Sequence, residues 1–406
     1  MHVPFFRFEF DPGALAGIEE CLRSGWLTTG PKTKEFEKQF ADYLQYDGEL
    51  HAVALNSCTA ALHLALEAIG IGRGDVVVVP TLTFAATAEV VRYFDATPVF
   101  VDTDPDTFNL DLDHLEEVLT TLRDGKPIPQ LGTDYGEVKA IIPVHYAGQP
   151  CDMVRIHRFA ERFGVQVIED AAHAFPAGWK NGDSVKYVGA GSSRVACFSF
   201  YANKTITTSE GGMAVTTDEE LADRMRLMAL HGMNRDAWKR FTASGSWDYQ
   251  LVAPGYKYNM TDIASSIGLS QLTRAEEFRT SRKAISEAYN AAFEPCDQID
   301  TLTWGDGLLH SHHLYIIKLK LESLRVNRAE FVDILKEHGI MCSVHWRPLH
   351  MHPYYKETYG YQAEDYPVAG CEWERIVSLP LFPSMQLAET QYVIDTVLRV
   401  AKENAK

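Results

Sequence analysis

The sequence predicts an α/β protein with a largely parallel central sheet that is covered by helices on both faces. Two observations carry this prediction. From about Phe40 to Thr217, runs with helical spacing alternate with runs of strand character, which is the pattern of a parallel sheet connected by helices. The run DVVVVP, at Asp75 to Pro80, is apolar without alternation, as expected for a strand that is buried on both faces.

The predicted elements follow one another in the order that such a sheet requires. A helix is expected at Thr59 to Ile69, because Leu62, Leu66 and Ile69 recur at helical spacing. The strand at 75–80 comes next. The later elements of this half are, in chain order, a helix at Thr87 to Phe94, strands at Pro98 to Asp102 and Ala140 to Val144, a helix near Val154 to Phe163 and a strand at Val165 to Asp170.

After Asp218 the regular alternation ends, and the last part of the chain has the pattern of a smaller α+β domain. A helix from Glu219 to Leu230 leads into a polar and aromatic stretch, Asn234 to Tyr249, whose composition is that of a long functional loop. The remaining predicted elements are one long helix from Asp262 to about Ala291, a strand at His313 to Leu319 and a helix at Arg328 to His338. A chain of 406 residues suits two packed domains, which we place at residues 1–250 and 251–406. The N-terminal segment is a candidate to pack against the second domain.

Composition excludes several classes of function. A net charge of −17 argues against a nucleic-acid partner, because phosphate backbones require clustered Lys and Arg. The seven cysteines are scattered without a CxxC pair, which predicts reduced thiols and neither a disulfide framework nor a metal site. The sequence has no signal-peptide pattern and no apolar run of about 18 residues, so we expect a cytoplasmic protein without a membrane partner.

Ligands of open parallel sheets bind beyond the carboxyl ends of the strands. Three segments follow predicted strands and carry chemical side chains: Pro80 to Phe84, His145 to Gly148 and Asp170 to His173. We expect these segments to border the ligand site.

Lys204 is the first candidate for chemistry. An apolar strand, Cys197 to Tyr201, delivers this lysine into small polar residues that end in Gly211 and Gly212. A lysine in such surroundings loses its proton more easily, since desolvation disfavours the ammonium form, and it can then form an imine with an aldehyde. A lysine on an exposed loop is the competing interpretation.

Asp170 is the second candidate, at the end of the strand VQVIED. A pyridine ring that acts as an electron sink needs an acidic partner on its nitrogen. Asp170 suits this role better than Glu169, whose side chain should point to the opposite face of the sheet. His173 lies close enough along the chain to reach an oxygen of the same ring. The competing interpretation is that Asp170 only caps the next helix.

The third candidate is the helix start in NSCTAAL, where Asn56, Ser57, Cys58, Thr59 and Ala60 place small and hydroxylic residues. Free amides and the helix dipole make such a start a phosphate site, although Ser and Thr are also ordinary helix caps. Phe84 follows the next strand, where it could stack on a planar ligand or belong to the core.

Along nearly its whole length, the chain resembles the sugar aminotransferases of the DegT/DnrJ/EryC1/StrS family, which are fold-type I enzymes that depend on pyridoxal 5'-phosphate (PLP). Within the family, WLTTGP, HYAG and GYKYN resemble most the enzymes that aminate C4 of UDP-linked sugars. The segments that carry the resemblance are GWLTTGPKTKEFEKQF (Gly25 to Phe40), NSCTAALHLAL, PTLTFAATAE, IIPVHYAGQPCDM, VIEDAAHA, FSFYANKTITTSEGGM, PGYKYNMTDIASSIGLSQL (Pro254 to Leu272) and SLPLFPSM (Ser378 to Met385).

The resemblance implies roles for individual residues. Lys204 would hold PLP as an imine and move the proton, Asp170 would pair with the pyridine nitrogen, and His173 would sit by the phenolic oxygen. Thr59, Ala60 and the hydroxyl of Ser199 would hold the phosphate, with Phe84 stacked on the ring. Cys58 stands beside them, where relatives often carry Gly or Ala, and is given no chemistry. Asn259 would reach the phosphate of a neighbouring subunit, which implies a homodimer with shared active sites. The substrate side would include Thr29, Trp238, Tyr256 and His345.

The implied domains are therefore a large PLP-binding domain at residues 1–250 and a small C-terminal domain at 251–406. The implied reaction takes the amine of glutamate, through the pyridoxamine phosphate form, to a nucleotide-linked keto-sugar. Two alternatives stay open at this point. A sugar 3-dehydratase of the same fold would carry histidine in place of Lys204, and a non-catalytic regulator would bind PLP or a sugar nucleotide without turnover.

Overall fold

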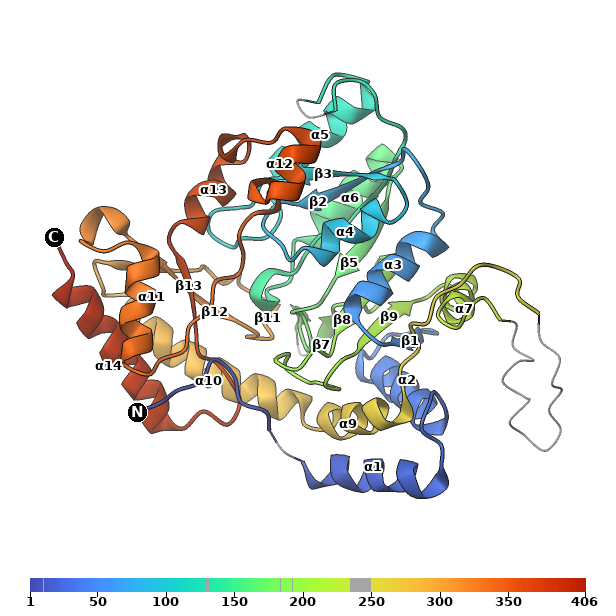
Figure 1. The fold of residues 1–406 in the computed structure, drawn as a ribbon, viewed down its shortest axis with the longest axis horizontal. Coiled ribbons are helices and arrows are strands. Elements are labelled where there is room, and N and C mark those ends of the chain that lie inside the picture. Colours follow the sequence, from blue (N-terminus) through green and yellow to red (C-terminus); the bar gives the residue numbers. More distant parts are fainter. Residues whose placement is uncertain (10, 129–130, 183, 192, 234–249) are drawn as a thin grey trace.

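The computed structural model describes residues 1–9, 11–128, 131–182, 184–191, 193–233 and 250–406 (Figure 1). The loop predicted at Asn234 to Tyr249, with Trp238 in it, lies outside the described residues. The described chain forms a large sheet with helices on both faces, a smaller antiparallel sheet beside it and a further short three-stranded antiparallel sheet. The fold class predicted from the sequence is confirmed.

All strands of the seven-stranded large sheet except β9 run in one direction. In spatial order the strands are β1 (His51–Leu55), β9 (Gly212–Thr216), β8 (Val195–Ser199), β5 (Gln166–Asp170), β4 (Val138–Ile141), β2 (Val76–Pro80) and β3 (Thr97–Val101). The chain between β8 and β9 contains no helix, and strands joined without a crossover helix run antiparallel. Lys204 lies in this reversing connection.

The helices cover the two faces of the sheet in separate groups. On one face, α3 and α7 pack against alternate strand residues such as Ile168 and Cys197. On the other face, α5 and α6 pack over β2 and β3, and α2 packs over β1, β8 and β9. The helices of this half are α1 (Pro12–Ser24), α2 (Pro31–Tyr43), α3 (Cys58–Ala68), α4 (Ala86–Arg92), α5 (Leu112–Arg123), α6 (Met153–Phe163) and α7 (Glu219–Met228).

The helix predicted as continuous from Asp262 to Ala291 is two helices, α9 (Asp262–Leu272) and α10 (Ala275–Phe293). The break falls at Thr273 and Arg274, where the backbone of Arg274 leaves helical geometry (φ −108°, ψ 5°). Neither residue is a Gly or Pro, so local sequence gives no stop signal at this point. The prediction of one helix was therefore wrong.

The smaller sheet is antiparallel and has the strand order β10 (Ile299–Thr301), β12 (Tyr315–Leu319) and β13 (Ile376–Leu379). Val3 pairs with Ile340 at its side, so the N-terminal segment lies against this part of the molecule. The boundary at residue 250 stays a prediction. The remaining elements are β6 (Gly178–Asn181), β7 (Ser184–Tyr187), β11 (Leu308–Leu309), α11 (Arg328–Glu337), α12 (Pro353–Tyr359), α13 (Pro367–Trp373), α14 (Leu387–Glu403) and 3₁₀ turns at Tyr146–Gly148, Leu321–Ser323, Leu349–Met351 and Ala363–Asp365.

Within the described residues, no helix combines the length and apolar character that a membrane crossing requires.

Candidate active site

A cleft of about 450 Å³ opens where β5 and β8 end and where the chain leaves β2. Its volume lies in the range of small-molecule and cofactor sites. The residues predicted for the site that line this cleft are Cys58, Thr59, Phe84, Asp170, His173, Ser199, Lys204 and His345. The rule that ligands bind beyond the carboxyl ends of parallel strands therefore locates the cleft correctly.

Lys204 is half-buried in the connection between β8 and β9, and its backbone amide donates to Tyr201 O (3.0 Å). Burial lowers the pKa of Lys204 to about 8, although the acidic groups of Cys58 and Asp170 act in the opposite direction. About one tenth of such an amine is unprotonated at pH 7, and that form is a nucleophile. The sequence argument from the uncharged surroundings of Lys204 anticipated this shift.

Asp170 ends β5 with its carboxylate buried (5% exposed). It accepts hydrogen bonds from Thr87 Oγ1 (2.8 Å) and from the amide of Ala172 (3.1 Å). Burial raises the pKa of Asp170, while these two hydrogen bonds and the charge of Lys204 act against the rise. The cleft is therefore lined by an amine and a carboxylate whose charges act on each other.

Glu169, the neighbouring carboxylate, points to the other face of the sheet, as predicted. It accepts a hydrogen bond from His145 Nε2 (3.0 Å), and both side chains are fully buried. His145 Nδ1 accepts from the amide of Cys151 (3.0 Å), which fixes the ring between the two partners. The expectation that His145 to Gly148 would border the ligand was wrong, because these contacts turn His145 away from the cleft.

His173 lies in an aromatic wall of the cleft. Its ring centre is 4.3 Å from that of His313, and it stacks on Trp346 at 5.0 Å. Burial, reinforced by the charges of Lys204 and His345, lowers the pKa of His173 well below its usual value, so the imidazole is neutral. His173 Nδ1 has no hydrogen-bond partner within the described part of the chain.

His313 and Trp346 line the cleft but were missed from the sequence. The first lies in the run HSHH before β12, and the second follows His345 directly. The run HSHH could have been a signal, because several histidines lie together before a strand. His313 is buried and uncharged, and its Nδ1 is also unpartnered in the described residues. His345 is held by Ser378 Oγ at 2.7 Å from Nδ1, and burial lowers its pKa to about 4.

The first turn of α3 forms the other end of the cleft. Ser57 caps the helix by accepting from the amide of Ala60 (3.0 Å), and Ala60 itself does not line the cleft. Thr59 and Ser199 lie at the wall with their hydroxyl groups. Burial raises the pKa of the Cys58 thiol well above its usual value, and Sγ donates to Cys197 O (3.5 Å). A thiol without a thiolate form carries no nucleophilic chemistry, in agreement with the sequence interpretation.

Besides Ala60, three predicted residues of the described chain lie outside the cleft. Asn259 Nδ2 donates to Thr29 Oγ1 (2.7 Å), and Thr29 Oγ1 donates to Met260 O. Tyr256 stacks on Tyr258 with ring centres 5.0 Å apart. Trp238 lies outside the described residues. The chain thus brings the cofactor candidates together, except for Ala60 and Asn259.

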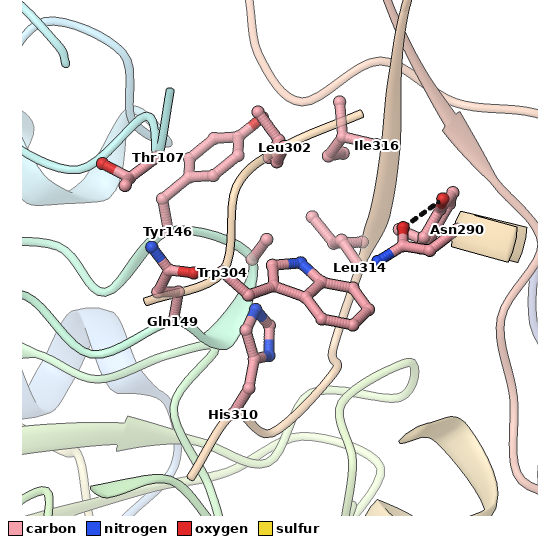
Figure 2. Close-up of a pocket in the computed structure, with 11 residues that line it drawn as sticks. Thr107, Tyr146, Gln149, Asn290, Leu302, Trp304, His310, Leu314 and Ile316 are labelled. Carbon is pink, nitrogen blue, oxygen red and sulfur yellow. Dashed lines mark hydrogen bonds between the residues drawn. The ribbon is translucent and has the colours of Figure 1, made fainter. Parts of the chain in front are cut away.

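A second hollow, lined by other residues than the cleft, is too small for a substrate. Figure 2 shows the Trp304 ring in it, among Tyr146, His310 and Leu314. Its volume of about 10 Å³ holds at most about one water molecule. Within the described residues, no three His, Cys, Asp or Glu side chains gather as a metal site.

The chain matches the family model described as the DegT/DnrJ/EryC1/StrS aminotransferase family over residues 11–398. It is 43% identical to an uncharacterized protein of Methanocaldococcus jannaschii over 402 residues, which are 99% of this chain and 98% of that protein. It is 42% identical to the spore coat polysaccharide biosynthesis protein SpsC of Bacillus subtilis over 386 residues, which are 95% of this chain and 93% of SpsC.

Solved structures agree with this match. The putative sugar aminotransferase Spr1654 from Streptococcus pneumoniae, in its PMP form, is 33% identical and has a TM-score of 0.86, with 99% of this chain and 98% of that chain covered. Its PLP form has the same TM-score. The chain therefore belongs to the DegT/DnrJ/EryC1/StrS family of PLP-dependent sugar aminotransferases, with the fold-type I architecture.

Proposed function

We propose that the protein transfers the amino group of glutamate to the keto carbon of a nucleotide-linked sugar, and that Lys204 and Asp170 carry the reaction. The observation that supports this most is that both residues line one cleft of cofactor size, together with the neutral imidazole of His173. The relative SpsC acts in polysaccharide biosynthesis, which favours a sugar destined for a glycan. A UDP-linked 4-keto-sugar is the first candidate, on the resemblance of WLTTGP and GYKYN.

The residues of the cleft fit PLP. The half-buried amine of Lys204 suits the aldehyde, the buried carboxylate of Asp170 suits the ring nitrogen, and the unpartnered His173 suits a ring oxygen. Phe84, with 58% of its surface exposed at the cleft, leaves a ring face for stacking. The first turn of α3 with the hydroxyls of Thr59 and Ser199 suits the phosphate.

Each residue then has a defined task in the reaction. When bound, PLP withdraws electrons from the carbon that carries the amine. Lys204 Nζ takes the proton from the amino-donor carbon and later delivers one to the sugar carbon, and a positioned base of this kind contributes roughly 10²–10⁴-fold. Asp170, in its ionised form, would stabilise a positive charge on the ring nitrogen of the bound cofactor. His173 stays neutral, so it can hydrogen-bond without adding a second positive charge beside Lys204.

The spectrum of the bound cofactor tests the proposed function. The protein is loaded with PLP, treated with glutamate and freed of small molecules, after which UDP-, dTDP- and GDP-linked keto-sugars are added one at a time. We expect glutamate to bleach the visible band and one keto-sugar to restore it, with the amino-sugar detected by mass spectrometry. If glutamate leaves the band unchanged, then glutamate is not the donor. If no keto-sugar restores it, the nucleotide-sugar acceptor is refuted.

Lys204 also separates the alternatives. A sugar 3-dehydratase would carry histidine at this position, and the chain carries lysine. A non-catalytic regulator would bind PLP without any change of its spectrum on addition of glutamate.

We also propose a cytoplasmic homodimer whose subunits share their active sites. Asn259 supports this, because it lies outside the cleft of its own chain and is held by Thr29. Light scattering of the PLP-loaded protein tests the dimer, and a monomer that turns over at full rate would refute shared sites.

Gly212 gives a test of the phosphate end of the cleft. A Cβ on this residue would lie 2.4 Å from Ser57 C and 2.5 Å from Cys58 N, which are backbone atoms of the first turn of α3. The Gly212→Ala variant must displace that turn. We therefore expect the dissociation constant for PLP to rise about tenfold or more. An overpacked side chain typically costs about 1–3 kcal/mol, which corresponds to a change of this size. Equilibrium titration with PLP measures it. Gly72→Ala is the matched control, because a Cβ there meets only Asp75 Oδ2 at 3.9 Å.

A further inference from the structure

A chain of buried hydroxyl groups leads from the wall of the cleft to Asp170. Thr87 Oγ1 lies 2.8 Å from Asp170 Oδ2, and Thr83 Oγ1 lies 2.8 Å from Thr87 Oγ1. Thr83 and Thr87 are 1% and 0% exposed, and Thr83 lines the cleft. Thr83 precedes α4 and Thr87 lies in its first turn, four residues further on, so the start of one helix supplies both hydroxyls.

The protons of this chain have a fixed direction as long as Asp170 is ionised. A carboxylate only accepts hydrogen bonds, so Thr87 must donate its single hydroxyl proton to Oδ2. Thr87 can then only accept from Thr83, which must donate its own proton. The chain thus directs two hydroxyl dipoles toward the carboxylate, and hydrogen bonds in such a chain strengthen one another.

We propose that Thr87 is a positioning residue that keeps Asp170 ionised and correctly oriented, and that Thr83 reinforces it from the cleft wall. The inference rests on the proposed function, since it assumes that Asp170 faces a positively charged ring nitrogen. Thr87 is the one side chain that hydrogen-bonds to Asp170 among the described residues, and the other donor is the backbone amide of Ala172.

The charged and titratable groups around Asp170 do not make the hydrogen bond from Thr87 unnecessary. Lys204, from the β8–β9 connection, and His145, from the chain after β4, favour the ionised carboxylate. The thiols of Cys58 on α3 and Cys197 on β8 also face it, but burial raises the pKa of both thiols, so they stay neutral. Burial raises the pKa of Asp170 itself, and the hydrogen bond from Thr87 is the foremost influence that lowers it.

The sign of the pH effect follows from this balance. Asp170 supports the site when ionised, and this support is lost as the pH falls through its pKa. Loss of the Thr87 hydroxyl raises that pKa. The acid limb of the pH profile, where PLP affinity and turnover fall with falling pH, therefore moves to higher pH. A hydrogen bond to a charged group is typically large enough to move such a limb by about one to two pH units.

Four variants of the PLP-loaded protein test the proposal. Thr87→Val keeps the size of the side chain and removes the hydroxyl, whereas Thr87→Ser keeps the hydroxyl. Thr83→Val removes only the outer link. Thr216→Val is the matched control, because Thr216 is also buried (2% exposed) and its hydroxyl donates to Arg194 O (2.7 Å). This hydrogen bond lies at the ends of the strands that are farthest from the cleft. The dissociation constant for PLP, the visible spectrum and the turnover rate are measured as functions of pH.

For Thr87→Val we expect the pH at which PLP affinity and turnover fall on acidification to be higher than in the wild type by about one to two pH units. Thr87→Ser should restore the wild-type profile, Thr83→Val should move the limb less in the same direction, and Thr216→Val should not move it. Identical profiles for Thr87→Val and the wild type would overturn the proposal, as would an equal shift in Thr216→Val. Failure of the proposed function is distinguishable, because the wild type itself would then show no spectral response to glutamate.

Discussion

The Lys204→Ala variant is expected to lose roughly 10⁴-fold or more of its transamination rate while it keeps its fold. Lys204 is the single lysine that lines the cleft within the described chain, and burial holds its pKa near 8, so other described side chains cannot replace both its nucleophilic amine and its proton transfer. Borohydride reduction followed by peptide mass spectrometry should find PLP attached to the wild-type peptide that contains Lys204 and to none in the variant. Turnover is measured with the donor and acceptor found for the wild type.

Lys139→Ala is the control for this experiment. Lys139 is a half-buried lysine on β4 that pairs with Glu137 (2.5 Å) and does not line the cleft, so its loss should change neither the adduct nor the rate. A covalent adduct on another lysine in the wild type would show that Lys204 has been assigned wrongly. A variant that keeps full turnover would do the same.

The second large effect is expected for Asp170→Asn, which keeps the shape of the side chain and removes its charge. We expect the turnover rate to fall roughly 10²–10³-fold, the loss typical when a preorganised electrostatic partner is removed. The asparagine cannot stabilise a positive charge on the ring nitrogen, so PLP affinity should fall as well. Stopped-flow spectra of the reaction with glutamate measure the rate of the first half-reaction directly.

Glu169→Gln is a matched control, since the two carboxylates are neighbours on β5 and face opposite sides of the sheet. Glu169 bonds to His145 at 3.0 Å in a fully buried pair, so its replacement should lower stability and leave the spectrum unchanged. An equal loss of rate in both variants would indicate that the end of β5, and not the charge of Asp170, is what matters.

The sequence predicted those parts of the site that depend on local order along the chain. Asp170 and Lys204 follow buried strands, and the alternation of side chains along β5 separated Asp170 from Glu169 correctly. The ends of β2 and β5 were predicted correctly because their apolar runs stop where the sheet meets the cleft, whereas β4 and β8 end before the predicted Val144 and Tyr201. The start of α3 was found because Ser57 is a recognisable cap.

Contacts between distant segments could not be predicted in this way. Trp346 reaches His173 from far along the chain, and no local pattern indicates that their rings stack. Tyr256 packs on Tyr258 beside His63, so its side chain is used outside the cleft. The break between α9 and α10 falls at Arg274, whose guanidinium pairs with Glu277 at 2.6 Å and Glu9 at 3.7 Å, and the second of these is a tertiary contact.

The cleft draws its walls from Ser57 in the first turn of α3 and from Trp346 near the other end of the chain. An unfolded chain holds these walls far apart and so has no site at all. Any molecule that the cleft retains therefore binds only the native state, and it stabilises that state by mass action. At a free concentration 100 times its dissociation constant, such a ligand adds about 2.7 kcal/mol to the free energy of unfolding. The thermal stability of this protein is accordingly a joint property of the polypeptide and of the supply of its cofactor.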